Sequence, residues 1–295
     1  MKPLFAALCT FAFAILSPKT ANATPPDGGF SDYVLAAVEM LDGDKSRAGQ
    51  GYGSGYFTKD LRFGAGDTLK ASDKAPLTMC VAAQMEVLVE ALNMWSEKNK
   101  NNSPFDFLPK VLWQRLRPLD FRGMIWIVKN SPSSGAGYAL EHFGMGHLVP
   151  FKGLFPGSFI NFNRTNKSGH AGVFLGYIDK NGNDLDTYSN DVAGFKYFSS
   201  QGMNKPKPIS GLGKRWGFFS DVACPDKLPS GHLRDCGIIR SEKNGYLVGG
   251  YVLDPSNWDA KKGNAAVVTN NDATSPELTT EGTFNAVFFN GETTD

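Results

Sequence analysis

The spacing of apolar residues predicts a buried helix over residues 78–95. Apolar side chains recur there every three or four positions, as they do on one face of an α-helix. These positions are Val81, Met85, Leu88 and Leu92. Pro76 stands just before the first turn, where helices commonly begin, so we expect Cys80 to lie in that turn.

Three β-strands are expected in the second half of the chain. Residues 158–163 alternate between apolar and polar, and residues 171–178 are mostly apolar. His170 opens the second strand directly after Gly169, and the turn sequence that begins at Asp179 ends it. The sequence GFKYFSSQG, which starts at Gly194, predicts the next strand.

Shorter helices are expected before these strands. One lies near residues 31–41. Ser103 and Pro104 predict the start of another over residues 104–117, because Pro suits the first helical position. The sequence GYALEHFG ends in a Gly where a helix C-cap belongs, so it predicts a helix that ends there.

The C-terminal part of the chain carries one strong turn sequence. Asn244 and Gly245 form the dipeptide most typical of a tight β-hairpin. After Trp258 the chain is rich in Asn and Thr, so we expect an irregular tail over residues 259–295 with a final strand at 284–289.

The whole pattern predicts a single α+β domain over residues 24–295. The chain has 295 residues, of which 41% are hydrophobic and 20% charged, which excludes collagen-like, coiled-coil and wholly disordered proteins. We expect a Gly-rich, mostly irregular region over residues 24–75 and a helical insertion over about 98–150. The net charge of +1 gives no reason to expect nucleic acid as a partner.

The first 23 residues have the pattern of a secretory signal peptide. Lys2 supplies a positive charge, and the apolar stretch 4–16 is too short to span a bilayer. Residues 21–23, Ala-Asn-Ala, form a small-x-small cleavage site. We therefore expect cleavage after Ala23, export to the periplasm or the exterior, and a mature chain without membrane attachment. An uncleaved N-terminal anchor is the alternative.

Export makes the cysteines informative, because disulfides form in oxidising compartments. Cys9 leaves with the signal peptide, so Cys80, Cys224 and Cys236 remain. Cys224 and Cys236 flank a loop with Pro and Gly and are expected to form a disulfide. Cys80 is then a free thiol. It is either a small buried apolar residue or a nucleophile stabilised by the N-terminus of its helix.

A thiolate nucleophile needs a base, and the chain has four histidines. His142 and His147 resemble a metal-binding pair only loosely and lack a zinc motif, so no metal site is expected. His232 lies inside the disulfide loop and is expected at the surface. His170, at the start of a strand, is the best candidate for the base. A structural histidine at a strand edge is the alternative.

The sequence PGSFINFNRTNKSGHAGVFLGY resembles the strand–turn–Gly-His–strand core of the NlpC-type and CHAP-type papain-like cysteine peptidases and amidases. These exported bacterial enzymes cut peptide or amide bonds in the stem peptides of peptidoglycan. The resemblance implies a papain-like fold in which a Cys-bearing helix packs on an antiparallel β-sheet.

Applied to this chain, the resemblance implies that Cys80 is the nucleophile and His170 its base. The third catalytic residue would lie on the next strand. Gln201 is favoured because its amide oxygen can accept the imidazole N–H. Ser199 is the alternative, and either residue alone is equally consistent with an ordinary edge position. Family members also place a tyrosine hydroxyl near the oxyanion, for which Tyr52 and Tyr56 are the candidates.

These roles imply amide hydrolysis through an acyl-enzyme, with backbone N–H groups near Cys80 stabilising the oxyanion. They require neither a metal nor an organic cofactor, and they imply a Cys80 pKa well below that of a free thiol. The expected substrate is a peptidoglycan peptide. The mature protein is expected to be a monomer, and a protein inhibitor is a further candidate partner.

The chain departs from the family pattern at several positions. Met79 and Val81 flank Cys80 where the family has Asp and Ser, and Ser158 replaces the Asp of a Pro-Gly-Asp motif. The 90 positions between Cys80 and His170 require an insertion. Two alternatives therefore stay open: a protein-directed cysteine protease or acyl transferase of the same fold, and a non-catalytic cell-wall-binding protein.

Overall fold

The computed structural model describes most of the chain between residues 29 and 271. The described residues are 29–44, 46, 51–53, 56–71, 73, 75–115, 119–125, 135–166, 168–201, 210–228 and 231–271. The expected signal peptide and the expected strand at 284–289 lie outside them.

A mixed eight-stranded sheet dominates the described β-structure. Its strand order is β3-β10-β4-β5-β7-β8-β9, with β6 pairing with β5 off this path. The strands are β3 (Gly146–Val149), β4 (Phe159–Asn163), β5 (Gly169–Ile178), β6 (Asp184–Leu185), β7 (Gly194–Gln201), β8 (Gly211–Phe219), β9 (Arg234–Ile238) and β10 (Leu247–Val252). All neighbours are antiparallel except β8 and β9. The expectation of a purely antiparallel sheet is therefore wrong at its β9 edge.

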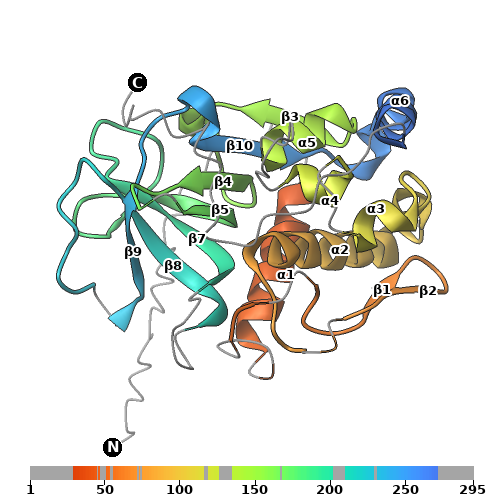
Figure 1. The fold of residues 1–295 in the computed structure, drawn as a ribbon, viewed down its shortest axis with the longest axis horizontal. Helices are drawn as coiled ribbons and strands as arrows, with labels where there is room; N and C mark the ends of the chain where they lie inside the picture. Colours follow the sequence, from red (N-terminus) through yellow and green to blue (C-terminus); the bar gives the residue numbers. More distant parts are fainter. Residues whose placement is uncertain are drawn as a thin grey trace, which may run out of the picture.

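The helices gather beside one part of this sheet, with β9 at the outer edge on the far side (Figure 1). They are α1 (Phe30–Gly43), α2 (Cys80–Asn99), α3 (Lys110–Gln114), α4 (Phe121–Met124), α5 (Ala136–His142) and α6 (Ala260–Asn271). A small hairpin of β1 (Leu61–Phe63) and β2 (Asp67–Leu69) lies near α2 and α3. None of the described helices is long and apolar enough to cross a membrane.

Helix α2 is the central helix of the fold. Met79 is extended and precedes the first helical residue, Cys80, so the expected helix is confirmed with a start two residues later. The Gln84 amide donates to the backbone oxygens of Gly172, at 2.6 Å, and Ile160, at 3.2 Å. These bonds fix α2 over β4 and β5. Because α1 packs on α2 as well, α2 is buried on more than one face.

The sheet separates two apolar clusters. The first contains Cys80, much of α1 and α2, and the side chains of Ala171, Val173 and Phe198. The second, on the opposite face, contains Phe162 and Tyr197 among others. Alternation along β4, β5 and β7 explains the division, because successive strand side chains point to opposite faces.

Two expected helical features differ in the structure. Within the described residues 104–115, the helix expected over 104–117 is replaced by a 3₁₀ turn, Ser103–Phe105, and the five residues of α3. Pro109 interrupts it, because a proline disfavours helical geometry in the residue before it. The irregular tail is wrong for residues 260–271, which form α6. The Asp259 carboxylate accepts the Lys262 backbone N–H in its first turn.

The expected hairpin at Asn244 and Gly245 is also wrong. Lys243–Gly245 is a short 3₁₀ helix, and the strands on its two sides do not pair with each other. β9 pairs with β8, whereas β10 inserts between β3 and β4. Pairing with the distant strands β3 and β4 decides where β10 lies.

Candidate functional site

Cys80 lies at the N-terminus of α2 with its side chain fully buried. Burial raises the pKa of the thiol to about 12, although the backbone N–H groups of Ala171 and Val81 and the charge of Arg164 favour the thiolate. The expectation of a lowered Cys80 pKa is therefore wrong for this state. Backbone amides and one guanidinium do not replace the hydration that the thiolate loses.

The Cys80 sulfur lies where two strands separate. β5 pairs with β4 as far as Gly169, and β7 pairs with β8 as far as Gln201. The ladder between β5 and β7 already ends at the pair Val173–Phe198. Beyond this pair, Ser199 Oγ donates to the backbone oxygen of Ala171 at 2.6 Å. The N–H of Ala171 and the sulfur of Cys80 therefore meet at this opening in the sheet.

Tyr52 contacts Cys80 directly. Its hydroxyl donates to the Cys80 sulfur over 3.8 Å, and its backbone forms a parallel bridge with Thr78. The hydroxyl thus lies beside the atom that would attack a substrate. Tyr56, the other candidate, is 48% exposed and lies beside the guanidinium of Arg122. The structure brings Tyr52, and not Tyr56, to the thiol.

His170 lies at the start of β5 and is also buried. Its ring contacts Phe162 and Tyr197, with ring centres 5.4 and 5.7 Å away. Burial holds the pKa of the imidazole well below its usual range, and Arg164 adds to this effect. Asp235 and the Gln201 side chain act in the opposite direction. The imidazole is therefore neutral at physiological pH.

Cys80 and His170 approach the opening between β5 and β7 from different sides. The His170 ring packs with residues of the second cluster, whereas Cys80 belongs to the first. Arg164 influences the pKa of both groups. No hydrogen bond joins the thiol and the imidazole in the described structure. The two side chains are neighbours of Ala171, but they do not form a dyad in this state.

The two candidates for the third residue have different partners. Gln201 is among the side chains that raise the pKa of the His170 imidazole. Ser199 instead donates to the backbone oxygens of Ala171 and Ser200. Because the Ser199 hydroxyl is engaged by backbone oxygens, Gln201 remains the candidate partner of His170.

A buried polar network that the sequence did not indicate extends from Gln201. The Tyr197 hydroxyl lies 2.5 Å from Gln201 Oε1 and 2.6 Å from Asp235 Oδ2. Both Asp235 oxygens accept from Arg164, at 2.8 and 2.7 Å. Burial alone would raise the pKa of Asp235, but Arg164 lowers it, so the carboxylate is ionised. The strand alternation of Tyr197 and Gln201 was the only available sequence signal.

The expected disulfide is present between Cys224 and Cys236, whose Cα atoms are 5.9 Å apart. Cys236 lies on β9 beside Asp235, so the crosslink adjoins the polar network. Within the loop it closes, His232 is exposed and stacks on Trp216. Among the described residues, no cluster of three or more His, Cys, Asp or Glu side chains could hold a metal.

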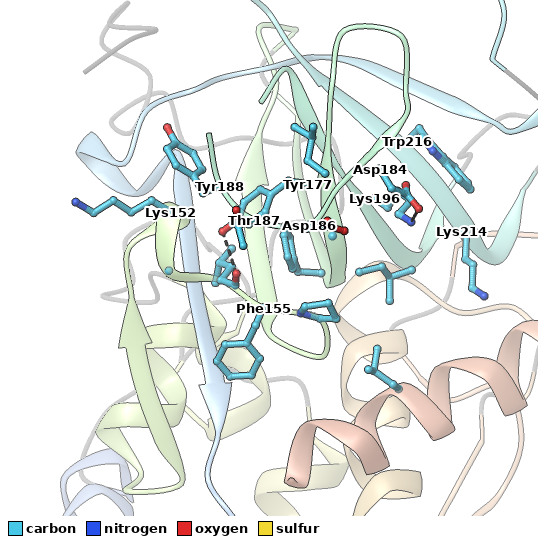
Figure 2. A pocket seen from close by; sticks show the side chains of 18 of the residues that line it. Lys152, Phe155, Tyr177, Asp184, Asp186, Thr187, Tyr188, Lys196, Lys214 and Trp216 are labelled. Atoms are coloured by element: carbon cyan, nitrogen blue, oxygen red, sulfur yellow. Dashed lines mark hydrogen bonds and ion pairs between the residues drawn. The ribbon is translucent and has the colours of Figure 1, made fainter. Parts of the chain in front are cut away.

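A cavity of about 660 Å³ lies elsewhere on the sheet (Figure 2). None of the six candidate catalytic residues lines it. Figure 2 shows Lys152 and Tyr188 towards one end and Lys214 and Trp216 towards the other. Lys214 is bound by the Glu39 carboxylate at 2.6 Å. This cavity therefore combines aromatic walls with paired charges and is separate from Cys80.

A scan of protein-family models, a search of curated proteins and a search of solved structures each found no match for this chain. The described fold is α+β with a mixed sheet.

Proposed function

We propose that the protein is a cysteine hydrolase that cleaves an amide or peptide bond, with Cys80 as nucleophile and His170 as base. The observation that supports this most strongly is the placement of Cys80. It begins a buried helix and lies against the backbone of Ala171, the residue after His170. The Tyr52 hydroxyl lies on the same sulfur. A cysteine at a helix start, a histidine on a strand and a polar partner are the residue types that thiol hydrolases use, and here Cys80 and His170 both adjoin Ala171.

In the proposed reaction, His170 takes the proton of the Cys80 thiol and the thiolate attacks the substrate carbonyl. The backbone N–H groups near the start of α2 and the Tyr52 hydroxyl stabilise the negative oxygen. The imidazolium then protonates the leaving amine, and a water molecule releases the acid from the acyl-enzyme.

This chemistry requires a change from the described state. A thiol with a pKa of about 12 beside a neutral imidazole is not ionised at physiological pH. Substrate must reach the sulfur, and the Cys80 side chain must come within hydrogen-bond reach of the imidazole. The described state is thus a closed form, in which Tyr52 covers the sulfur.

The proposed substrate is a stem peptide of peptidoglycan. The family resemblance of the Gly-His strand and the expected export of the chain support this choice. A protein substrate is the alternative within the same chemistry. Digestion of purified peptidoglycan, with products identified by mass spectrometry, separates the two. New muropeptides from the wild type and none from Cys80→Ala support the proposal, whereas cleavage of proteins with intact muropeptides contradicts the substrate.

A non-catalytic wall-binding protein is the second candidate function. The full burial of Cys80 and its raised pKa favour it, because both are typical of an inert structural thiol. This candidate predicts that the protein co-sediments with peptidoglycan and that Cys80→Ala binds equally well. The absence of released fragments from the wild type would then be expected.

A further inference from the structure

The contacts around Tyr197 form a continuous connection from the disulfide-bearing strand to His170. Asp235 on β9 contacts the Tyr197 hydroxyl, and this hydroxyl contacts the Gln201 side chain. The Tyr197 ring contacts the imidazole, with ring centres 5.7 Å apart. Gln201 ends β7, the strand beside β5, and its side chain is among the groups that raise the pKa of the imidazole. Each of these residues lies within the buried or half-buried part of the sheet. The connection crosses β9, β7 and β5, so no single strand could provide it.

We propose that Asp235 is a positioning residue for His170: through Tyr197 and Gln201, it fixes the orientation and the tautomer of the imidazole. The expected effect on the rate of hydrolysis rests on the proposed function. The expected orientation and tautomer of His170 do not depend on whether the protein is an enzyme.

The chemistry of these groups determines which of them donates and which accepts each hydrogen bond. An ionised carboxylate only accepts hydrogen bonds, so the single proton of the Tyr197 hydroxyl points to Asp235. The Tyr197 oxygen then needs a donor from Gln201, which its amide NH₂ supplies after a 180° turn of the amide. That turn leaves the Gln201 oxygen to accept one N–H of His170. The other imidazole nitrogen is thereby left without a proton, as a base for Cys80 must be.

Two features hold Asp235 at the start of this connection. Arg164 binds both of its carboxylate oxygens, and each side chain of this pair is only 12% exposed. The disulfide Cys224–Cys236 lies at the next residue along β9. Arg164 binds the carboxylate itself, and the disulfide anchors the next residue of the strand. The Asp235 carboxylate therefore has little freedom to move away from Tyr197.

The test compares Tyr197→Phe with Tyr177→Phe in the mature protein. Tyr197→Phe removes only the hydroxyl that joins Asp235 to Gln201 and retains the ring. Tyr177→Phe is the matched control, because its buried hydroxyl bonds the backbone oxygens of Phe151 and Leu154 instead. The readout is the ¹⁵N NMR spectrum of His170, assigned with His170→Asn. Wild type and Tyr177→Phe should show one neutral tautomer, and Tyr197→Phe a mixture of two.

Hydrolysis provides the second readout. Tyr197→Phe should lower kcat by about 10- to 100-fold at an unchanged KM, whereas Tyr177→Phe should not. An unchanged tautomer in Tyr197→Phe overturns the inference, whatever the activity. A mixed tautomer in Tyr197→Phe, from a wild type that hydrolyses nothing, supports the positioning of His170 and contradicts the proposed function instead.

Discussion

At the scale of single residues, Cys80 shows how a helix N-terminus and burial oppose each other. The first-turn N–H groups and Ala171 favour the thiolate, but full burial raises the pKa to about 12. Position on the helix is visible in the sequence, whereas the degree of burial depends on what covers the residue. For this reason the helix position of Cys80 could be predicted from the sequence, whereas the pKa of its thiol could not.

Removal of the Tyr52 side chain should expose this thiol. Tyr52→Ala should speed alkylation of Cys80 by iodoacetamide at pH 7 by at least about 10-fold, because access of reagent controls the reactivity of a buried thiol. Tyr52→Phe retains the ring and should change the rate little. Tyr56→Ala, at the exposed tyrosine nearby, is the control. Equal rates in wild type and Tyr52→Ala would show that Tyr52 does not cover the sulfur.

The raised pKa of Cys80 predicts a loss of stability in alkaline solution. The unfolded thiol ionises near pH 8.5 but the folded one does not, so the stabilisation is complete below that pH and is lost as pH rises towards 12. Between pH 7 and pH 10, the wild type should lose about 2 kcal/mol more of its unfolding free energy than Cys80→Ser. Urea titrations at both pH values measure this difference. Parallel losses would show that the thiol is hydrated in the folded protein.

Among the helices and strands, those that were predicted correctly are the ones whose apolar residues follow a regular local spacing. α1, α2, β4, β5 and β7 occur where the apolar pattern placed them, within a few residues. The parallel pairing of β9 with β8 could not be read from it, because pairing depends on contacts between distant segments. The same applies to the hairpin expected at Asn244 and Gly245, which tertiary pairing of β10 overrides.

The edge strand β9 should depend on its disulfide. The bond closes a loop with a sequence separation of 12 residues, so Cys224→Ser should lower the unfolding free energy by about 2–3 kcal/mol. Denaturant titrations of wild type and Cys224→Ser measure the loss, and reduction of the wild type should reproduce it. Cys80→Ser under reduction is the control for effects on the free thiol. An unchanged midpoint in Cys224→Ser would show that the stability of β9 does not depend on the disulfide.

At the scale of the whole molecule, the candidate site joins segments far apart in the chain. Tyr52 precedes Cys80 by 28 positions, and Arg164 precedes its partner Asp235 by 71. Cys80, His170 and Gln201 could be predicted as candidates from the sequence, because each has a local pattern or a family motif. Arg164, Tyr197 and Asp235 could not, because their contacts form only when β9 joins the sheet. The burial of Cys80 likewise follows from the assembled fold.

The most direct test of the account is the hydrolysis of purified peptidoglycan by wild type, Cys80→Ala, His170→Ala and His147→Ala. His147 is an exposed histidine on β3 and is the matched control for the loss of an imidazole. Circular dichroism should show that all four proteins are folded. Wild type and His147→Ala should release muropeptides, and Cys80→Ala and His170→Ala should release none. Release by Cys80→Ala at the wild-type rate would contradict the role of Cys80 as nucleophile.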